Sequence, residues 1–164
     1  MIIKDFQLTK IINSNLFQSF LIYGPNEGLV RENIDLVYKK FSDNSDCEKL
    51  YITNKQLDED PSVLQNEMSS ISMFNTKKFI VLDSLKEKHL TLIEKCLLEN
   101  YENIFLIIKL DNLAKSSKIR KLYETSKIHF CLACYDDDLK VLSSLLEKFQ
   151  KEQNIIFDSY VKSF

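Results

Sequence analysis

The residues that come closest to a pattern for chemistry form one short segment near the N-terminus. Gly24-Pro-Asn-Glu-Gly28-Leu-Val-Arg31 follows an apolar run that ends at Tyr23 and leads into a segment of helical period. A strand, a glycine turn and a helix N-terminus are the usual setting for a phosphate-binding loop, because the free N–H groups of the helix attract anions. The chain has two glycines and both lie in this segment, which predicts a sharp backbone turn there.

The segment departs from the phosphate-loop pattern G-x-x-x-x-G-K-[ST] wherever that pattern does chemistry. With Gly24 set as the first glycine, Leu29 stands at the second glycine and Val30 at the lysine. Leu29 places a side chain where backbone must approach phosphate, and Val30 supplies no cation for the β- and γ-phosphates. Arg31 occupies the position of the Ser or Thr whose hydroxyl binds Mg²⁺. A guanidinium cannot bind Mg²⁺ in its place, although the guanidinium of Arg31 can still attract an anion. We therefore expect neither ATP hydrolysis nor a bound cofactor.

A second remnant of a nucleotide site is the apolar run 79–82, which ends in Asp83. P-loop ATPases end the corresponding strand in a metal-binding aspartate and follow it with a catalytic glutamate, where this chain has Ser84. Alone, Asp83 is more typical of a residue that caps a turn. Together with the glycine segment it favours a degenerate ATPase core. A working P-loop ATPase with an irregular loop stays an alternative.

The thiols and imidazoles of the chain form no metal-ligand pattern. Cys131 and Cys134 have the CxxC spacing, but a zinc ribbon needs a second such pair. The remaining candidates stand alone in the sequence and are Cys47, Cys96, His89 and His129. We therefore expect reduced cysteines and buried structural histidines, and no metal site.

Short apolar runs alternate with longer segments of helical period along most of the chain. The runs cover 20–23, 50–52, 79–82, 104–108 and 128–132. The expected helices cover 29–41, 61–68, 88–99 and 118–125. Strands without polar residues are typical of parallel sheets covered on both faces, and strand–helix repetition gives right-handed crossovers. The pattern predicts an α/β fold with a parallel sheet flanked by helices.

The pattern changes at Asp136-Asp-Asp138, an acidic run that can cap the next helix. Leucines follow at helical spacing as far as Phe149, and a second capping residue, Asp158, precedes the end of the sequence. We expect one domain over residues 1–136 and the truncated beginning of a helical domain over 137–164.

Composition and charge exclude several classes of protein. The net charge of −2 gives no general attraction to nucleic acid, so contact with DNA needs a local patch or an assembly. No apolar run approaches the length of about 18 residues that marks a membrane-spanning helix. The N-terminus lacks the charged and apolar regions of a secretory signal. We expect a cytoplasmic protein with no membrane partner.

Four stretches of the sequence carry a resemblance to a known family. They are Phe20–Glu32, Ser69–Val81, Asp111–Glu124 and Cys134–Asp138. In this order they resemble the delta subunit of bacterial DNA polymerase III, the clamp-loader subunit that opens the sliding clamp. The resemblance implies an AAA+-like N-terminal domain without a functional nucleotide site, followed by a small helical lid domain. The collar domain that holds the family's subunits together has no counterpart in this sequence.

The resemblance implies a clamp-binding site at Ile71, Ser72, Met73 and Phe74. Met73 and Phe74 would insert into a hydrophobic pocket of the sliding clamp, the beta subunit. The physical setting agrees, because these two large apolar side chains follow an expected helix and precede a polar stretch. Burial of both under the sheet is the alternative that the sequence leaves open. The implied partners are the sliding clamp, the other clamp-loader subunits and, through the assembly, DNA.

A basic stretch is the remaining candidate surface. Its candidate contact residues are Lys115, Lys118, Arg120 and Lys121. Charge-rich helices usually present a solvated face, which is the simpler interpretation. A contact with another loader subunit or with the DNA backbone is the functional alternative, and salt-dependent binding would favour DNA. A truncated adaptor that binds the clamp but loads nothing also stays open.

Overall fold

The computed structural model describes residues 1–14, 18–43, 45–70, 77–99 and 103–135, and residues 143, 146, 147, 149–152 and 155 further on. The chain divides into two compact units, Met1–Cys134 and Tyr135–Phe164. Every described strand belongs to the first unit. In the second unit, the described residues from 143 to 152 are helical. The expected domain boundary after residue 136 and the expected lid domain stay predictions.

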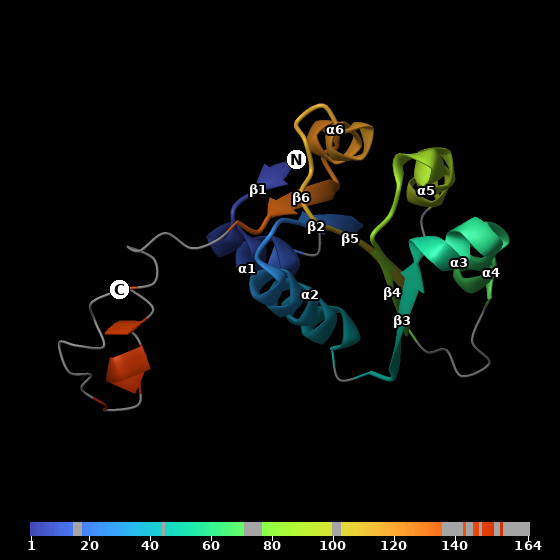
Figure 1. Ribbon diagram of the computed structural model, residues 1–164. Coiled ribbons are helices and arrows are strands. Elements are labelled where there is room, and N and C mark those ends of the chain that lie inside the picture. The colour runs from blue at the N-terminus through green and yellow to red at the C-terminus, as the bar shows by residue number, and fades with distance from the viewer. Residues whose placement is uncertain are drawn as a thin grey trace. The chain divides into compact units, whose positions relative to one another are not determined.

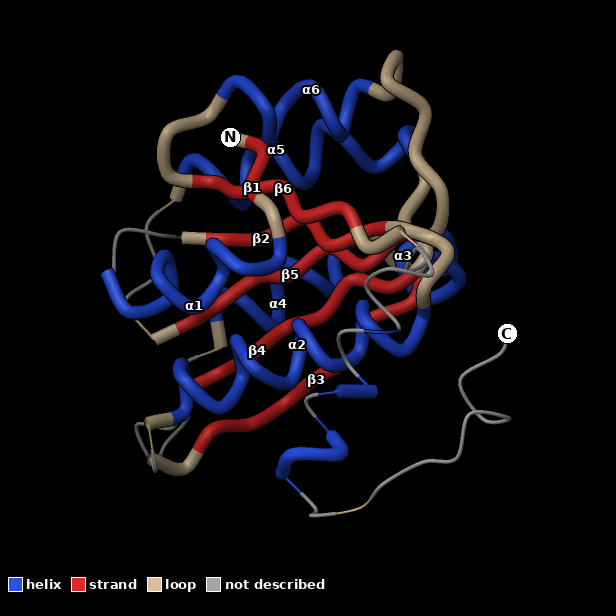
Figure 2. Tube along the Cα trace, turned by 90° about the vertical axis from the view of Figure 1, so that its left-hand side faces the viewer, coloured by secondary structure: helices blue, strands red, loops and turns tan. Residues whose placement is uncertain are grey.

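Six strands form one parallel sheet in the order β1-β6-β2-β5-β4-β3 (Figure 2). Their bounds are β1 Ile2–Ile3, β2 Ser19–Tyr23, β3 Cys47–Thr53, β4 Lys77–Asp83, β5 Ile104–Leu110 and β6 His129–Ala133. The chain runs from β2 to the edge strand β3, returns through β4 and β5, and crosses β2 to reach β6. This reversal makes the carboxyl ends of β2 and β5 the place where open α/β sheets bind ligands.

Helices cover both faces of the sheet (Figure 1). One face carries α1 Asp5–Ser14 and α2 Glu27–Ser42. The other carries α3 Asn54–Glu59, α4 Ser62–Ser69, the 3-10 helix η1 Glu87–His89, α5 Leu90–Leu98 and α6 Lys118–Thr125. Among the described residues, no helix is both long and apolar enough to cross a membrane.

The core lies in two layers, one on each side of the sheet. All five residues of β2 are buried, and successive side chains point to opposite faces. Phe20 and Ile22 pack in the layer under α1 and α2, whereas Leu21 and Tyr23 pack in the layer under α3 to α6. Burial on both faces explains the unbroken apolar runs. The prediction of a parallel α/β sheet flanked by helices is confirmed.

Three elements were not predicted from the sequence: β1, α1 and α3. A sequence signal for α3 did exist in Thr53 and Gln56, which form a capping box. The Gln56 N–H donates to Thr53 Oγ1 at 3.4 Å, and the Thr53 N–H donates to Gln56 Oε1 at 2.8 Å. The helix expected after Asp60 is α4, and the carboxylate of Asp60 accepts a hydrogen bond from the Ser62 N–H at 2.9 Å.

Candidate functional site

The loop after β2 turns at Gly24, as the sequence predicts. Gly24 has a φ of +145°, and a Cβ atom added there would lie 1.9 Å from the carbonyl oxygen of Cys134, so no other residue fits without rearrangement. Gly28 lies instead in the first turn of α2, and the nearest neighbour of an added Cβ would be Asn26 Oδ1 at 3.4 Å. The expectation that both glycines shape the turn is therefore wrong for Gly28.

In this loop, the backbone N–H groups of Gly24, Asn26 and Leu29 already have acceptors inside the protein. Asn26 is the N-cap of α2, and its Oδ1 accepts from the Leu29 N–H at 3.0 Å. The Asn26 N–H donates to Cys134 O at 3.2 Å, and the Gly24 N–H donates to Leu110 O at 3.3 Å. A phosphate-binding loop needs such groups free to point at the anion. Glu27 adds a negative charge in the first turn of α2, which disfavours an anion further.

The side chains at the phosphate-loop positions lie in three different environments. Val30 is 2% exposed and packs in the core under α2. Leu29 is half-buried against the same layer, and Arg31 is exposed. Of these three residues, Arg31 alone presents a polar group to solvent, and it lies on the helix beyond the turn.

The carboxylate of Asp83 is paired with a lysine from the neighbouring strand. Asp83 ends β4, Lys109 stands opposite it in β5, and Lys109 Nζ lies 3.0 Å from Asp83 Oδ2. The hydroxyl of Ser84 donates to the other oxygen, Oδ1, at 3.0 Å, and Ser84 adopts a left-handed φ of 57°. An ammonium therefore stands beside the carboxylate that would meet Mg²⁺ in a P-loop ATPase. The sequence singled out Asp83 but not its pairing with Lys109, which depends on the register between β4 and β5.

The expected clamp-binding residues Ile71, Ser72, Met73 and Phe74 lie outside the described residues. Their flanks are described: α4 ends at Ser69 before them, and β4 begins at Lys77 after them. The segment that contains them thus joins the sheet at the amino end of β4. The glycine loop and Asp83 lie at the other end of the sheet, where the strands have their carboxyl ends.

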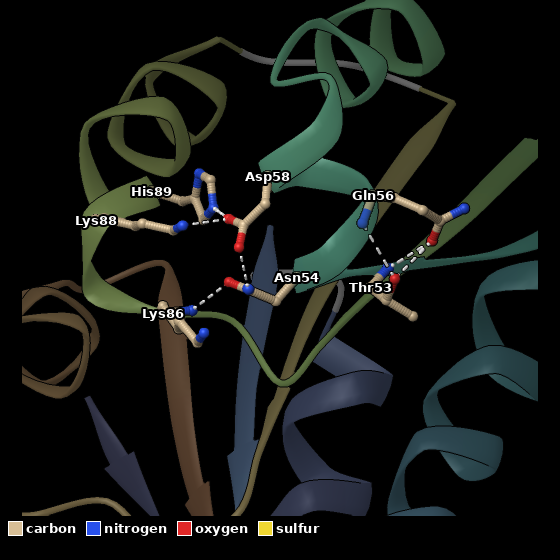
Figure 3. Close-up of polar contacts among 7 residues, drawn as sticks. All are labelled: Thr53, Asn54, Gln56, Asp58, Lys86, Lys88 and His89. Carbon is tan, nitrogen blue, oxygen red and sulfur yellow. Dashed lines mark hydrogen bonds and ion pairs between the residues drawn. The ribbon is translucent and has the colours of Figure 1, made fainter.

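A polar network fixes α3, which precedes α4, to the loop that begins α5 (Figure 3). Asp58 Oδ1 lies 2.6 Å from both His89 Nε2 and Lys88 Nζ. Asp58 Oδ2 accepts from Asn54 Nδ2 at 3.0 Å, and Asn54 Oδ1 accepts from the Lys86 N–H at 3.1 Å. Hydrogen bonds from Lys88 and then His89 lower the pKa of Asp58 from 3.8 to about 2. This network holds α3, the helix before α4 in the chain, against the segment from Lys86 to His89.

The four candidate contact residues of the basic stretch differ in their solvent exposure. Lys115, Lys118 and Lys121 are exposed. The side chain of Arg120 is 11% exposed, donates to Glu124 Oε1 at 2.5 Å, and lies 5.4 Å from the centre of the Tyr23 ring. Arg120 therefore stabilises α6 against the sheet, and the candidate surface is reduced to the three lysines.

The histidines and three of the cysteines are buried. His89 and His129 are 9% and 8% exposed, in agreement with their prediction as structural residues. Burial raises the pKa of the Cys96 thiol to about 11 and that of Cys131 to about 12, the opposite of what a nucleophilic thiol requires. Within the described part of the chain, no group of three or more metal-binding side chains comes together.

The fold defines a class, the α/β proteins with a parallel sheet that is covered by helices on both faces. A family model described as "DNA polymerase III, delta subunit" matches residues 20–135, more than half of the chain. The chain therefore belongs to the DNA polymerase III delta subunit family, whose members are components of clamp loaders. No curated protein matches the chain significantly by sequence.

The solved structures that are similar to this chain include two proteins of different organisms. The Bacillus subtilis DNA clamp loader delta protein (YqeN) matches with a TM-score of 0.62 and 10% sequence identity. The match covers 96% of this chain and 50% of that chain, so this chain spans half the length of the B. subtilis protein. C. elegans PCH-2 matches with a TM-score of 0.48 and 19% identity over 92% of this chain and 43% of that chain, a score too low to support an argument.

Proposed function

We propose that this chain is the clamp-contacting part of a clamp-loader delta subunit, which binds and opens the sliding clamp and has no catalysis of its own. The observation that carries the proposal is the family match, because it extends over residues 20–135 and so includes the segment with Met73 and Phe74. The fold shared with the B. subtilis DNA clamp loader delta protein supports the same assignment.

The energy for clamp binding would come from the apolar side chains of Met73 and Phe74. Moving each from water into a pocket on the clamp contributes about 1.5–3 kcal/mol, and such anchors dominate most interfaces. Opening follows if the pair fits the open clamp better than the closed one, because a ligand shifts an equilibrium by its difference in affinity. Binding energy, and no chemical step, would drive the change.

The absence of catalysis in this proposal is supported by the contacts around the glycine loop. Asn26 occupies the N-terminus of α2, and Lys109 neutralises the carboxylate of Asp83. Both would have to be displaced before Mg²⁺-ATP could bind in the usual way. We further propose that other loader subunits supply the nucleotide chemistry.

A pull-down on the immobilised sliding clamp tests the proposal. Met73→Ala combined with Phe74→Ala should abolish binding and leave the circular dichroism spectrum unchanged. Leu98→Ala is a matched control, since Leu98 is a large apolar side chain that is 86% exposed on α5. Binding retained by the double variant would remove Met73 and Phe74 from the mechanism, and a loss in Leu98→Ala would relocate the site.

A further inference from the structure

A buried lysine at the start of β4 holds the C-terminal end of α4. Lys78 is 6% exposed, and its Nζ lies 3.0 Å from the carbonyl oxygen of Glu67 and 3.0 Å from Glu67 Oε2. The same ammonium donates to the hydroxyl of Ser70. A cation at this position satisfies the unpaired carbonyl groups of a helix end and interacts favourably with its dipole.

The preceding residue makes the equivalent contact on the other face of the sheet. Lys77 Nζ donates to the carbonyl oxygen of Phe41 at 2.9 Å and lies 5.4 Å from the centre of the Phe41 ring. Phe41 belongs to the last turn of α2. Because successive strand residues point to opposite faces, the two lysines attach β4 to two different helices. Lys77 attaches β4 to α2, and Lys78 attaches it to α4.

The two contacts differ in what they do for the chain between α4 and β4. Residues 70–76 join the end of α4 to the start of β4, and this connection carries the proposed clamp-binding residues. Lys78 lies just after the connection, whereas Glu67 and Ser70 lie at its beginning. The lysine thus bridges the two ends of the connection. Backbone bonds hold each end separately, from Ser70 N–H to Asn66 O at 2.9 Å and from Lys78 N–H to Asn103 O at 2.8 Å.

We propose that Lys78 is a positioning residue for clamp binding, which fixes the two ends of the connection so that Met73 and Phe74 are presented together. This inference rests on the proposed function. Side chains that are held in place before binding lose less conformational freedom on binding, which raises affinity. Lys78 would act without contacting the clamp, because its side chain is buried against α4.

Four variants of the chain test this role. Lys78→Met removes the donor and keeps the length of the side chain, and Lys78→Arg restores a cation. Ser70→Ala is the milder variant, since Ser70 is exposed and surface substitutions usually change stability little. Lys77→Met is the matched control, because it removes the same chemistry from α2. Clamp affinity is measured by surface plasmon resonance, and amide hydrogen exchange is followed in the peptide from Glu67 to Lys78.

We expect Lys78→Met to weaken clamp binding about tenfold, which corresponds to about 1.4 kcal/mol, and to speed hydrogen exchange in the peptide. Ser70→Ala should change both quantities in the same direction by less, and Lys78→Arg should restore most of the affinity. Lys77→Met should change clamp affinity less than about twofold, a difference below about 0.5 kcal/mol.

The outcomes separate this inference from the proposed function. If Lys78→Met and Ser70→Ala bind the clamp normally while Met73→Ala with Phe74→Ala does not, Lys78 has no positioning role and the inference is overturned. If the Met73 and Phe74 variant also binds normally, the proposed function fails, and the inference fails with it. Unchanged hydrogen exchange in Lys78→Met would contradict the bridge between the two ends even if clamp binding fell.

Discussion

The ammonium of Lys109 lies 3.0 Å from Asp83 Oδ2, and the two residues stand directly opposite each other at the carboxyl ends of β5 and β4. Both side chains are about one-third exposed, at 31% and 29%. The lysine gives this edge of the sheet a charge arrangement that disfavours a divalent cation, because a like charge already stands at the carboxylate. The carboxylate that the sequence compares with a metal-binding aspartate is thus paired with a lysine of the same chain.

The first prediction concerns nucleotide binding. A fluorescent ATP analogue titrated with micromolar chain should show no Mg²⁺-dependent binding, because the N–H groups of Gly24, Asn26 and Leu29 have internal acceptors and Asp83 is paired. Weak binding that Mg²⁺ does not affect would be consistent with the exposed guanidinium of Arg31. Clear Mg²⁺-dependent affinity would instead establish the chain as a nucleotide-binding subunit.

The second prediction compares the two glycines. Gly24→Ala should lower the free energy of unfolding by about 2 kcal/mol or more, because the left-handed φ and the contact with Cys134 O both oppose a side chain. Gly28→Ala should be neutral or stabilising by up to about 1 kcal/mol, since Gly28 is helical and has space for a Cβ. Urea unfolding measures both, and equal effects would contradict the distinction between the two positions.

The third prediction concerns acid stability. Asp58 has a folded-state pKa of about 2 against an ordinary value of 3.8, so the stability it contributes is fully present above 3.8 and is lost as the pH falls through 2. Asp58→Asn should therefore flatten the fall in urea midpoint across this range. Glu59→Gln is the control, because Glu59 is exposed and its ion pair with Lys55 spans 3.8 Å. An unchanged profile in Asp58→Asn would show that the network in Figure 3 adds no acid-sensitive stability.

The fourth prediction concerns the three exposed lysines of the basic stretch. Replacing Lys115, Lys118 and Lys121 with glutamine should change the free energy of unfolding by less than about 0.5 kcal/mol, as expected of surface positions. For each of these lysines that binds a DNA phosphate, its replacement would reduce the slope of log affinity for DNA against log salt by about 0.9. If the variant assembles into the loader normally and its slope of log DNA affinity against log salt is unchanged, the three lysines belong to a solvated face.

Most strands could be predicted from the sequence, because a strand that is buried on both faces shows an apolar run within its own residues. β2, β4 and β5 are buried on both faces, so their residues form apolar runs that are typical of such strands. β1 has two residues, which is too short for any periodicity. Its place beside β6 depends on pairing with residues more than a hundred positions later in the chain.

The candidate site could be predicted only in part, because its decisive contacts join distant residues. The loss of phosphate-loop residues is visible at Val30, which the structure places in the core. The pairing of Asp83 with Lys109 depends on the register between β4 and β5, and the contact of Lys78 with α4 depends on which face each lysine meets. Neither is encoded by a local pattern. The prediction for Gly28 was wrong because, in sequence, a glycine in a first helical turn resembles one in a loop.

The most direct test of the central claim is size-exclusion chromatography of the purified chain with its own sliding clamp in the absence of nucleotide. The account predicts that the two proteins elute together, since the proposed binding energy comes from apolar side chains and needs no ATP on this chain. Co-elution should disappear when Met73 and Phe74 are both replaced by alanine. Separate elution of the unaltered chain and the clamp, or co-elution only when Mg²⁺-ATP is bound to this chain, would contradict it.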